Sequence, residues 1–530
     1  MMNEFNSGYQ YDRCVSRGIC SINPATASLQ EVIIIYLKYI SFYGLKLEEA
    51  GIKDKRIFNL ILNTISVLCS NYEISQTDFN MITSSFQKEL PEIIELYNQS
   101  CKKQGIKPEH LKTNNILNNS KNISDYIRLG EKEFKIRVQE LSDNVRNLYR
   151  ILFILIKSIC INILTYESYG YILHEEIISV MKTFNLLNTP QNDKNKLKNY
   201  VVKLAFTDCE LMEKLKCIRN KAYGEPEKTE VSFSTTKGKA ILVVGSNIKE
   251  LEQILDTTKN ENIDIYTHDN MILAHTYPKF KEYKHLKGQF GQGMESCLLD
   301  FSTFPGPIIL TRHSLFNIEN LYRGRLFTTG LAYSKGVIPI KNNDFSEVIK
   351  SAQESKGFKT GKKCTPETIG YNYKIVLENI KTKLNTKKYS QIIIIGVHGY
   401  SNEEKEYFTN FIKHIPENVL VISLPCCNST DNIICLNANY DFYTMYEISK
   451  EVIQISQNNE KISLIFPFCD RHTLSVMLEL AEYNSNIYFG IWNQTTINPN
   501  ITESLKADFN MNSLDSPKKD LLKIIDNQIN

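Results

Sequence analysis

The feature that most restricts the fold is a strand–helix–strand pattern near the middle of the chain. An apolar run over residues 238–246 contains a glycine at its end, residues 248–258 have helical spacing, and a β-branched run begins at Ile263. A strand, a helix and a strand in this order form a parallel crossover unit, because each segment must bury one face against the others. The sequence therefore predicts a parallel sheet that begins near residue 238.

The same alternation continues in the C-terminal part. Fully apolar runs such as residues 391–396 are typical of strands that are buried on both faces of a parallel sheet. Before residue 222 the chain has helical periodicity with short polar connections, which is typical of helical bundles. We predict an α + α/β protein, with a helical bundle domain over residues 1–222 and two Rossmann-like parallel α/β domains over residues 223–363 and 364–530.

The helical part is expected to begin near a proline. Pro24 opens a long amphipathic run to Tyr43, in which Ser28 and Glu31 have the spacing of a capping box. Further helical periods are expected in five segments, at residues 54–70, 77–101, 124–164, 175–187 and 194–217.

Composition narrows the functional classes. With 530 residues, 42% of them hydrophobic, and a net charge of +3, the chain is typical of a globular protein with several domains. It has no basic stripe interleaved with aromatics, so we expect no nucleic-acid partner. The most apolar segment, residues 151–164, is shorter than a membrane span and carries Lys157, and the N-terminus lacks a secretory signal. These patterns predict a cytoplasmic protein without a membrane partner.

The thirteen cysteines predict free thiols, because they are scattered along a chain without a secretory signal. Four of them lie in helical apolar patterns, where a free cysteine acts as a small core residue. These are Cys69, Cys160, Cys209 and Cys217.

Polar side chains gather after the strand that begins at Ile263. His268, Asp269, Asn270 and His275 follow this strand within a few residues. In open α/β folds, ligands bind in the crevice beyond the carboxyl ends of the strands. Residues 263–307 are therefore the segment where we expect a functional site.

Three later strand ends also carry polar or sulfur groups. They are His398, the pair Cys426 and Cys427, and the group Cys469, Asp470 and His472. Such residues ligate iron or zinc, so together with His268 and His313 they form a candidate metal-ligand set. The spacing is not that of a zinc finger or zinc ribbon, and polar residues that merely end strands are the alternative interpretation.

Five segments, in this order along the chain, match one known family: RCVSRGICSINPATASLQEVIIIYLKYISFYG, GKAILVVGSNIKELEQIL, IDIYTHDNMILAHTYPKFKEYKHLKGQFG, FPGPIILTRHSL and RLFTTGLAYSKG. On these segments the chain resembles the hybrid cluster proteins, also called prismane proteins or hydroxylamine reductases, which are related to the nickel carbon monoxide dehydrogenases. The resemblance implies an N-terminal 4Fe–4S cubane held by four cysteines and a hybrid iron–sulfur–oxygen cluster between domains. It also implies reduction of hydroxylamine or nitric oxide, hence a small N–O substrate and a redox partner.

Most of the ligand positions that the resemblance implies carry other residues in this chain. Ser246 stands where the family has a cluster histidine, Asn270 where it has a glutamate, Ser314 where it has a cysteine and His398 where it has the persulfide-bearing cysteine. Cys426 retains a thiol. Hydroxyl and amide groups are weak replacements, because soft thiolate donors are what hold iron and sulfide.

The remaining family positions are also altered. Asp470 and His472 stand where the family has the glutamate and lysine of its Trp-Tyr-Glu-Gln-Lys motif. The resemblance also implies a ligand cysteine near a Leu-Asp-Ala-Gly-Gln pattern, but residues 436–441 of this chain contain no thiol. Cys14 and Cys20 keep the spacing of the last two cubane cysteines, but residues 1–13 contain no cysteine. Two thiolates cannot close a four-thiolate cubane within one chain.

These substitutions predict that both clusters are absent or altered. The chain would then act as a non-catalytic binding or structural homologue, for example as the partner of an intact paralogue. Two alternatives remain, an active hydroxylamine reductase-type oxidoreductase with a remodelled iron–sulfur site and a protein with a single zinc or iron ion. The sequence assigns no catalytic residue.

Overall fold

The computed structural model describes most of the chain. The described residues are 24–69, 76–111, 122–188, 193–291, 296–312, 324–330, 336–386, 389–397, 402–425, 429–438, 441–456, 461–467, 470–483, 486–490 and 499–526.

Two compact units divide the chain. The first consists of Met1–Tyr200, Arg312–Asn320 and Gly330–Pro339, and the second of Val201–Thr311, Leu321–Thr329 and Ile340–Asn530. The predicted domain boundaries at residues 222 and 363 stay predictions.

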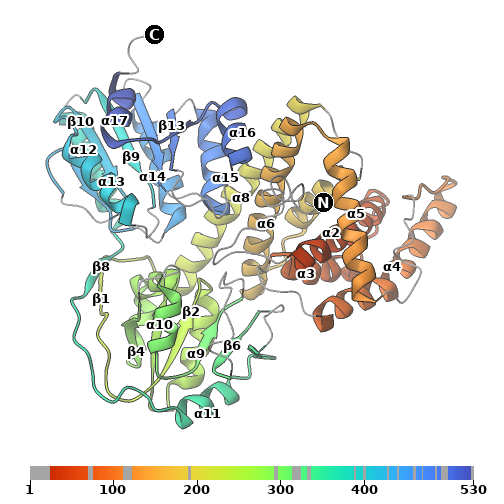
Figure 1. Cartoon of the computed structure of the whole chain (residues 1–530), viewed down its shortest axis with the longest axis horizontal. Coiled ribbons are helices and arrows are strands. Elements are labelled where there is room, and N and C mark those ends of the chain that lie inside the picture. The colour runs from red at the N-terminus through yellow and green to blue at the C-terminus, as the bar shows by residue number, and fades with distance from the viewer. Residues whose placement is uncertain are drawn as a thin grey trace, which may run out of the picture. The chain divides into compact units, whose positions relative to one another are not determined.

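The N-terminal region is helical, as the periodicity predicts (Figure 1). Its helices are α2 (Pro24–Glu49), α3 (Lys55–Cys69), α4 (Gln76–Gln104), α5 (Ile123–Glu140), α6 (Asp143–Ser168), α7 (His174–Leu186) and α8 (Lys194–Tyr223). Helix α2 lies at the centre of the bundle, since it packs against α3, α4, α5 and α7. Gly130 of α5 allows the closest approach, because a Cβ atom there would lie 1.9 Å from the carbonyl oxygen of Ser28.

Two local predictions about these helices are wrong. Ser28 does not cap a helix, because α2 already begins at Pro24 and the side chain of Ser28 is fully buried within it. The helix predicted over residues 124–164 is interrupted, since Leu141 and Ser142 are extended and separate α5 from α6. Ser142 occupies the N-cap position of α6 without a side-chain cap hydrogen bond, and the carboxylate of Asp143 in the first turn complements the helix dipole.

Helix α6 contains the apolar segment of residues 151–164. The helix is 26 residues long and therefore longer than this segment, because the more polar residues on either side are also helical. By length and composition α6 could cross a membrane. However, 72% of its most apolar 18-residue stretch is buried inside the protein, as in the core helix of a water-soluble protein.

The prediction that the helical cysteines are core residues is confirmed for two of them. Cys160 in α6 and Cys209 in α8 are buried, as expected, whereas Cys217 is exposed and that prediction is wrong. The side chain of Cys69 lies outside the described residues. The cysteines whose side chains the structure describes are all free thiols.

The first sheet has the predicted strand–helix–strand unit at its centre. Its strand order is β4-β3-β2-β5-β6-β7, with β2 (Lys239–Val244), β3 (Ile263–His268), β4 (Leu286–Gln289), β5 (Ile308–Leu310), β6 (Leu326–Thr328) and β7 (Ile338–Pro339). Strands β4 to β6 pair in parallel. The associated helices are α9 (Ile248–Thr258), α10 (Cys297–Thr303) and α11 (Ser346–Glu354), and two 3-10 helices follow β3, η1 (Asp269–Thr276) and η2 (Pro278–Glu282).

The second sheet is also parallel, as predicted. Its order is β11-β10-β9-β12-β13-β14, with β9 (Gln391–Ile395), β10 (Val419–Ser423), β11 (Ile433–Cys435), β12 (Lys461–Phe466), β13 (Asn486–Phe489) and β14 (Asn512–Ser513). Its helices are α12 (Tyr373–Thr386), α13 (Asn402–Lys413), α14 (Phe442–Ile455), α15 (Arg471–Leu480), α16 (Pro499–Phe509) and α17 (Pro517–Asp526), and a short 3-10 helix, η4 (Ala481–Tyr483), follows α15.

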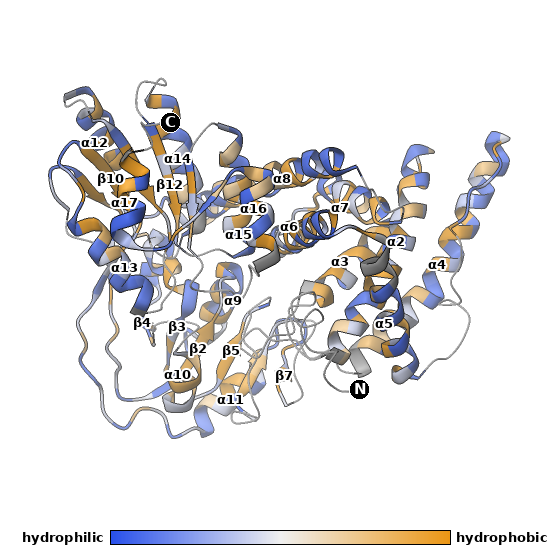
Figure 2. Ribbon diagram, turned by 45° about the horizontal axis from the view of Figure 1, so that its top comes forward, coloured by the Kyte–Doolittle hydropathy of each residue, from blue (hydrophilic) through white to orange (hydrophobic). Residues whose placement is uncertain are grey.

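Helices cover both faces of this second sheet. Ile393 and Ile395 of β9 share a core cluster with Phe408 of α13 and Leu521 of α17, while α14 packs on β9 as well. Neighbouring residues of a strand point to opposite faces, so both faces of β9 are buried. Figure 2 shows the resulting apolar strands, among them β10 and β12.

An antiparallel ribbon that sequence periodicity did not predict accompanies the two sheets. Strand β1 (Thr229–Val231) pairs with β8 (Glu367–Ile369). Both strands are short and pair across more than a hundred residues of sequence, so no local pattern identifies them.

Candidate functional site

The carboxyl ends of β2, β3 and β5 meet at one edge of the first sheet. The register pairs Val244 of β2 with both His268 of β3 and Leu310 of β5. The residues that directly follow these strands therefore lie at the same edge, as expected for a ligand site of an open α/β sheet. Two predicted site positions therefore lie at this edge. Ser246 follows Val244 by two residues, and Asn270 follows its strand partner His268 by two residues.

His268, the last residue of β3, forms a buried pair with a carboxylate. Its Nε2 lies 3.0 Å from Oδ2 of Asp300 in α10, and its side chain is inaccessible to solvent. Asp300 also accepts a 2.5 Å hydrogen bond from the hydroxyl of Ser296. His268 and Ser296 thus both bind the carboxylate of Asp300. The contact between His268 and Asp300 joins the end of β3 to α10.

Gly291 leaves the space that this carboxylate occupies. A Cβ atom at Gly291 would lie 2.1 Å from Oδ2 of Asp300, and its φ of +78° is one that side-chain-bearing residues rarely adopt. Only glycine therefore fits here without displacing Asp300.

Asp269 is a strongly perturbed group at this edge. Its φ is +60°, in the left-handed region that Asp and Asn tolerate better than most residues. Burial raises the pKa of its carboxyl from 3.8 to about 6, although the neighbouring His268 and the backbone N–H of Asn270 oppose the shift. Asp269 therefore stays partly protonated near pH 6, well above the usual range of an aspartate.

A hydrogen-bond network supports this left-handed turn. The Thr267 hydroxyl donates to Oε1 of Gln289 at 2.6 Å and lies 2.9 Å from Nε2 of His275. Nε2 of Gln289 donates to the carbonyl oxygen of Asp269 at 3.1 Å. Because a hydroxyl has a single proton, which Thr267 gives to Gln289, we infer that His275 carries its proton on Nε2.

His275 is neutral at physiological pH. Burial lowers the pKa of its imidazole from 6.5 to about 4. An imidazole with so low a pKa is a weak base near pH 7, and its hydrogen bond with Thr267 supports the turn.

Ser246 and Asn270 have different surroundings. Ser246 is exposed in the turn between β2 and α9, after Gly245, whose φ is +119°. Its neighbour Asn247 caps α9, because its side chain accepts the Glu250 N–H at 3.2 Å. Asn270 is half-buried in η1. Both positions offer only neutral donors.

Asp470 is engaged in the start of a helix at the carboxyl edge of the second sheet. It is the N-cap of α15, and its Oδ1 accepts hydrogen bonds from the backbone N–H of Thr473 at 2.8 Å and from the hydroxyl of Thr473 at 2.9 Å. The Asp470 N–H donates to that hydroxyl at 2.6 Å, which completes a capping box. Such a box stabilises a helix by about 0.5–2 kcal/mol, so the carboxylate already has a structural role.

His472 lies in the first turn of the same helix. Burial lowers the pKa of its imidazole, and the negative charges of Asp470 and Asp208 oppose this shift. Among the described residues, no three His, Cys, Asp or Glu side chains gather in a way that could hold a metal ion. The described site residues therefore lie at two places, Ser246 and Asn270 after β2 and β3 of the first sheet, and Asp470 and His472 at the start of α15.

The other predicted site residues lie outside the described part of the chain. They are Cys14, Cys20, Ser314, His398 and Cys426, and the candidate metal residues His313, Cys427 and Cys469.

Sequence reasoning missed the partners of the site residues. Asp300 and Gln289 had no assigned role, because both are distant from β3 in sequence. It also missed a buried polar cluster in which Tyr446 donates to Glu479 at 2.6 Å and Lys450 donates to the Tyr446 hydroxyl at 2.7 Å. The only available signal was a charged residue within an apolar helical period, such as Glu479.

The family comparison covers most of the chain. Residues 10–433 match the model of the Prismane/CO dehydrogenase family. The hydroxylamine reductase of Methanocella arvoryzae is 24% identical over 97% of both chains, and that of Thermodesulfovibrio yellowstonii is 24% identical over 97% of this chain and 98% of the relative. The hydroxylamine reductase of Acidithiobacillus ferrooxidans is 27% identical over 78% of this chain and 75% of the relative.

Solved structures similar to this one include carbon monoxide dehydrogenase IV from Carboxydothermus hydrogenoformans. The two have a TM-score of 0.49 and 10% sequence identity, with 99% of this chain and 93% of the other covered.

The family match extends over far more than half of the sequence, from residue 10 through the first sheet and into the second. The chain therefore belongs to the Prismane/CO dehydrogenase family.

Proposed function

We propose that this chain is a family member that does not assemble the hybrid cluster and that acts as a non-catalytic binding or structural protein in the cytoplasm. The observation that carries the proposal is the capping box of Asp470. This is a carboxylate at a family ligand position, and α15 uses it to satisfy the N–H of Thr473. The cap occupies Oδ1, which accepts both hydrogen bonds from Thr473, so only the second carboxylate oxygen of Asp470 could ligate a metal while the cap is kept.

The other described positions support the same conclusion. Ser246 presents a hydroxyl to solvent, and Asn270 presents an amide where the resemblance implies a carboxylate. Neither brings the negative charge that stabilises a cluster of iron ions. In the sequence, Ser314 and His398 replace two further thiolates, and Cys426 is the one that remains. This donor set does not fit an iron–sulfur–oxygen cluster.

Metal analysis tests the proposal. The full chain is purified anaerobically, and its iron, acid-labile sulfide and zinc contents are measured with its visible spectrum. We expect less than about one iron per chain, no sulfide and no turnover of hydroxylamine with a reduced dye. A brown protein with several irons and sulfides per chain would contradict the proposal.

A thiol variant sharpens this test. In a protein without a cluster, Cys426→Ser leaves the metal content and the thermal stability unchanged, because no metal depends on that thiolate. Cys435→Ser is the matched control, since Cys435 also lies near a strand end of the second sheet. Loss of iron in the Cys426 variant alone would identify a cluster ligand.

A mononuclear metal site is the second candidate, and strand register favours it. Strands β10, β9 and β12 are parallel neighbours that end at Ser423, Ile395 and Phe466. Within three residues of sequence, these strands are followed by Cys426, by His398, and by Cys469. Cys and His are common ligands of zinc and iron, so these three residues of the sequence are the candidate ligands.

The two candidates differ in a measurable way. A single zinc or iron per chain that is lost in His398→Ala would favour the mononuclear site. His414→Ala is the control, because this imidazole bonds to the carbonyl oxygen of Asn410 on an exposed surface of α13. Turnover of hydroxylamine or another small N–O substrate by that form would make the chain an oxidoreductase, which would need a redox partner. For either candidate we propose no membrane partner and no nucleic-acid partner.

A further inference from the structure

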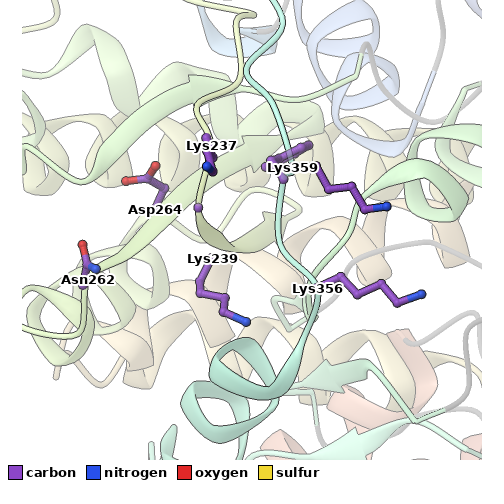
Figure 3. A pocket seen from close by; sticks show the side chains of 8 residues that line it. Lys237, Lys239, Asn262, Asp264, Lys356 and Lys359 are labelled. Atoms are coloured by element: carbon purple, nitrogen blue, oxygen red, sulfur yellow. The ribbon is translucent and has the colours of Figure 1, made fainter.

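A pocket lies at the amino ends of the first sheet, at the edge opposite the candidate site. It has a volume of about 480 Å³, and its lining includes Lys237, Lys239, Lys356, Lys359, Asp264 and Phe358. Lys239 begins β2 and Asp264 lies at the start of β3, whereas Ser246 and Asn270 follow the other ends of these strands. In Figure 3 the lysines come from two facing chain segments, and Asp264 lies on one side. None of these residues belongs to the site described above.

The two facing segments are held rigidly together. Gly238 and Phe358 exchange backbone hydrogen bonds of 3.1 and 2.8 Å, and Thr235 and Lys362 exchange another pair of 2.9 and 3.1 Å. A Cβ atom at Gly357 would lie 2.3 Å from the carbonyl oxygen of Gly238, so the backbones approach more closely than a side chain permits. The lysines therefore project from an ordered base.

An aromatic cluster anchors the second segment. The Phe358 ring packs edge-on against Tyr266 and Phe304, with ring centroids 5.7 and 5.5 Å apart. Tyr266 belongs to β3, so this packing joins the segment to the core of the sheet.

The charge of the pocket is strongly unbalanced. Asp264 already accepts a 2.5 Å hydrogen bond from the Thr236 hydroxyl and lies 3.5 Å from the ammonium of Lys287. Lys239 donates to the carbonyl oxygen of Ser355. Among the described residues, no carboxylate lies within ion-pair distance of the three other pocket lysines, which are Lys237, Lys356 and Lys359.

We propose that this pocket binds a small anion that carries two or more phosphate groups. Four lysines and one aspartate line the pocket, so its lining carries a net positive charge that a multivalent anion would neutralise. Ammonium groups act as point charges for phosphate oxygens and recognise charge more than shape. The volume is within the range of about 300–1,000 Å³ that small-molecule sites occupy. A hollow bounded by two chain segments suits a compact anion better than a flat acidic protein surface.

Calorimetry on the full chain tests the proposal with pyrophosphate and tripolyphosphate as probes. At about 100 mM KCl we expect tripolyphosphate to bind with a dissociation constant below about 1 mM, and pyrophosphate and sulfate to bind progressively more weakly. The affinity should fall as KCl is raised, because salt screens exposed charges.

A matched pair of variants locates the binding. The double variant Lys356→Glu with Lys359→Glu reverses two charges in the pocket and should weaken tripolyphosphate binding by at least about tenfold. The control, Lys362→Glu with Lys363→Glu, makes the same change in net charge on the same segment, outside the pocket lining, and should weaken binding by less than about twofold. The pair Lys356→Gln with Lys359→Gln replaces the first variant if thermal melts show that it does not fold.

The remaining outcomes overturn the proposal. These are no binding of tripolyphosphate, an equal loss in the pocket and control variants, or a loss in the control alone. Tighter binding of poly-glutamate than of tripolyphosphate also overturns it, because this would identify the lysines as a docking surface for an acidic protein.

Discussion

Replacing Asp269 by asparagine should stabilise the protein at neutral pH and leave its stability unchanged near pH 4. Burial raises the pKa of the Asp269 carboxyl from 3.8 to about 6. The folded protein therefore retains that proton more tightly than the unfolded chain does. Stability from this group is fully present below about pH 4 and is lost as the pH rises through about 6. Asparagine keeps the shape and tolerates the φ of +60° but does not ionise.

The magnitude follows from the size of the shift. A difference of roughly two pH units corresponds to about 3 kcal/mol between the two protonation states. Asp269 keeps some contact with solvent, which reduces the cost of its charge, so we expect about 1–3 kcal/mol. For a folding unit of roughly 300 residues, this free energy raises the melting temperature by about 2–5 °C.

Thermal unfolding between pH 4 and pH 8 provides the assay. The Asp269→Asn variant should melt with the wild type near pH 4 and progressively above it from pH 5 to pH 8. Asp256→Asn removes an exposed carboxylate from α9 in the same unit and controls for the loss of one negative charge. Hydrogen exchange over residues 263–277 tests whether the added stability is local to β3 and η1.

Two results would refute this reasoning. A stabilisation of equal size at pH 4 and pH 8 would mean that the titration of Asp269 is not its cause. A destabilisation at pH 8 would mean that the charged carboxylate forms an interaction that asparagine cannot replace.

Three further substitutions test the packing around the site and the second sheet. Thr267→Val removes a hydroxyl with two buried partners and should lower the free energy of unfolding by about 1–3 kcal/mol, measured by urea denaturation; an unchanged midpoint would contradict the network. Gly291→Ala should lower the melting temperature more than Gly324→Ala, since both glycines have positive φ but Gly324 has open space around it; equal losses would exclude the predicted clash. Lys216→Met leaves Glu447, whose pKa burial raises, without its ion pair and should cost about 2–4 kcal/mol, with a larger loss at pH 8 than at pH 5 in thermal melts.

Local sequence patterns account for the elements of the fold but not for all of their pairings. The apolar run in β9 predicts a strand that is buried on both faces, because this property depends on the residues of the strand itself. The position of β12 between β9 and β13 depends on contacts between distant segments, and no periodicity encodes it. The same holds for the ribbon of β1 and β8. Ser28 is an example of a wrong local prediction. Its spacing to Glu31 predicts a helix start, but α2 already begins at Pro24 and packs against several helices.

For the candidate site, the sequence by itself determined the chemical identity of the groups at the strand ends. Ser246 and Asn270 are neutral donors in any fold, and their place after parallel strands follows from local periodicity. Only the tertiary structure decided that Asp300 meets His268, that Asp470 caps α15 and that the pKa of Asp269 rises to about 6. Residue identity and periodicity are local properties, whereas hydrogen-bond partners and desolvation depend on segments that come together only in the folded chain.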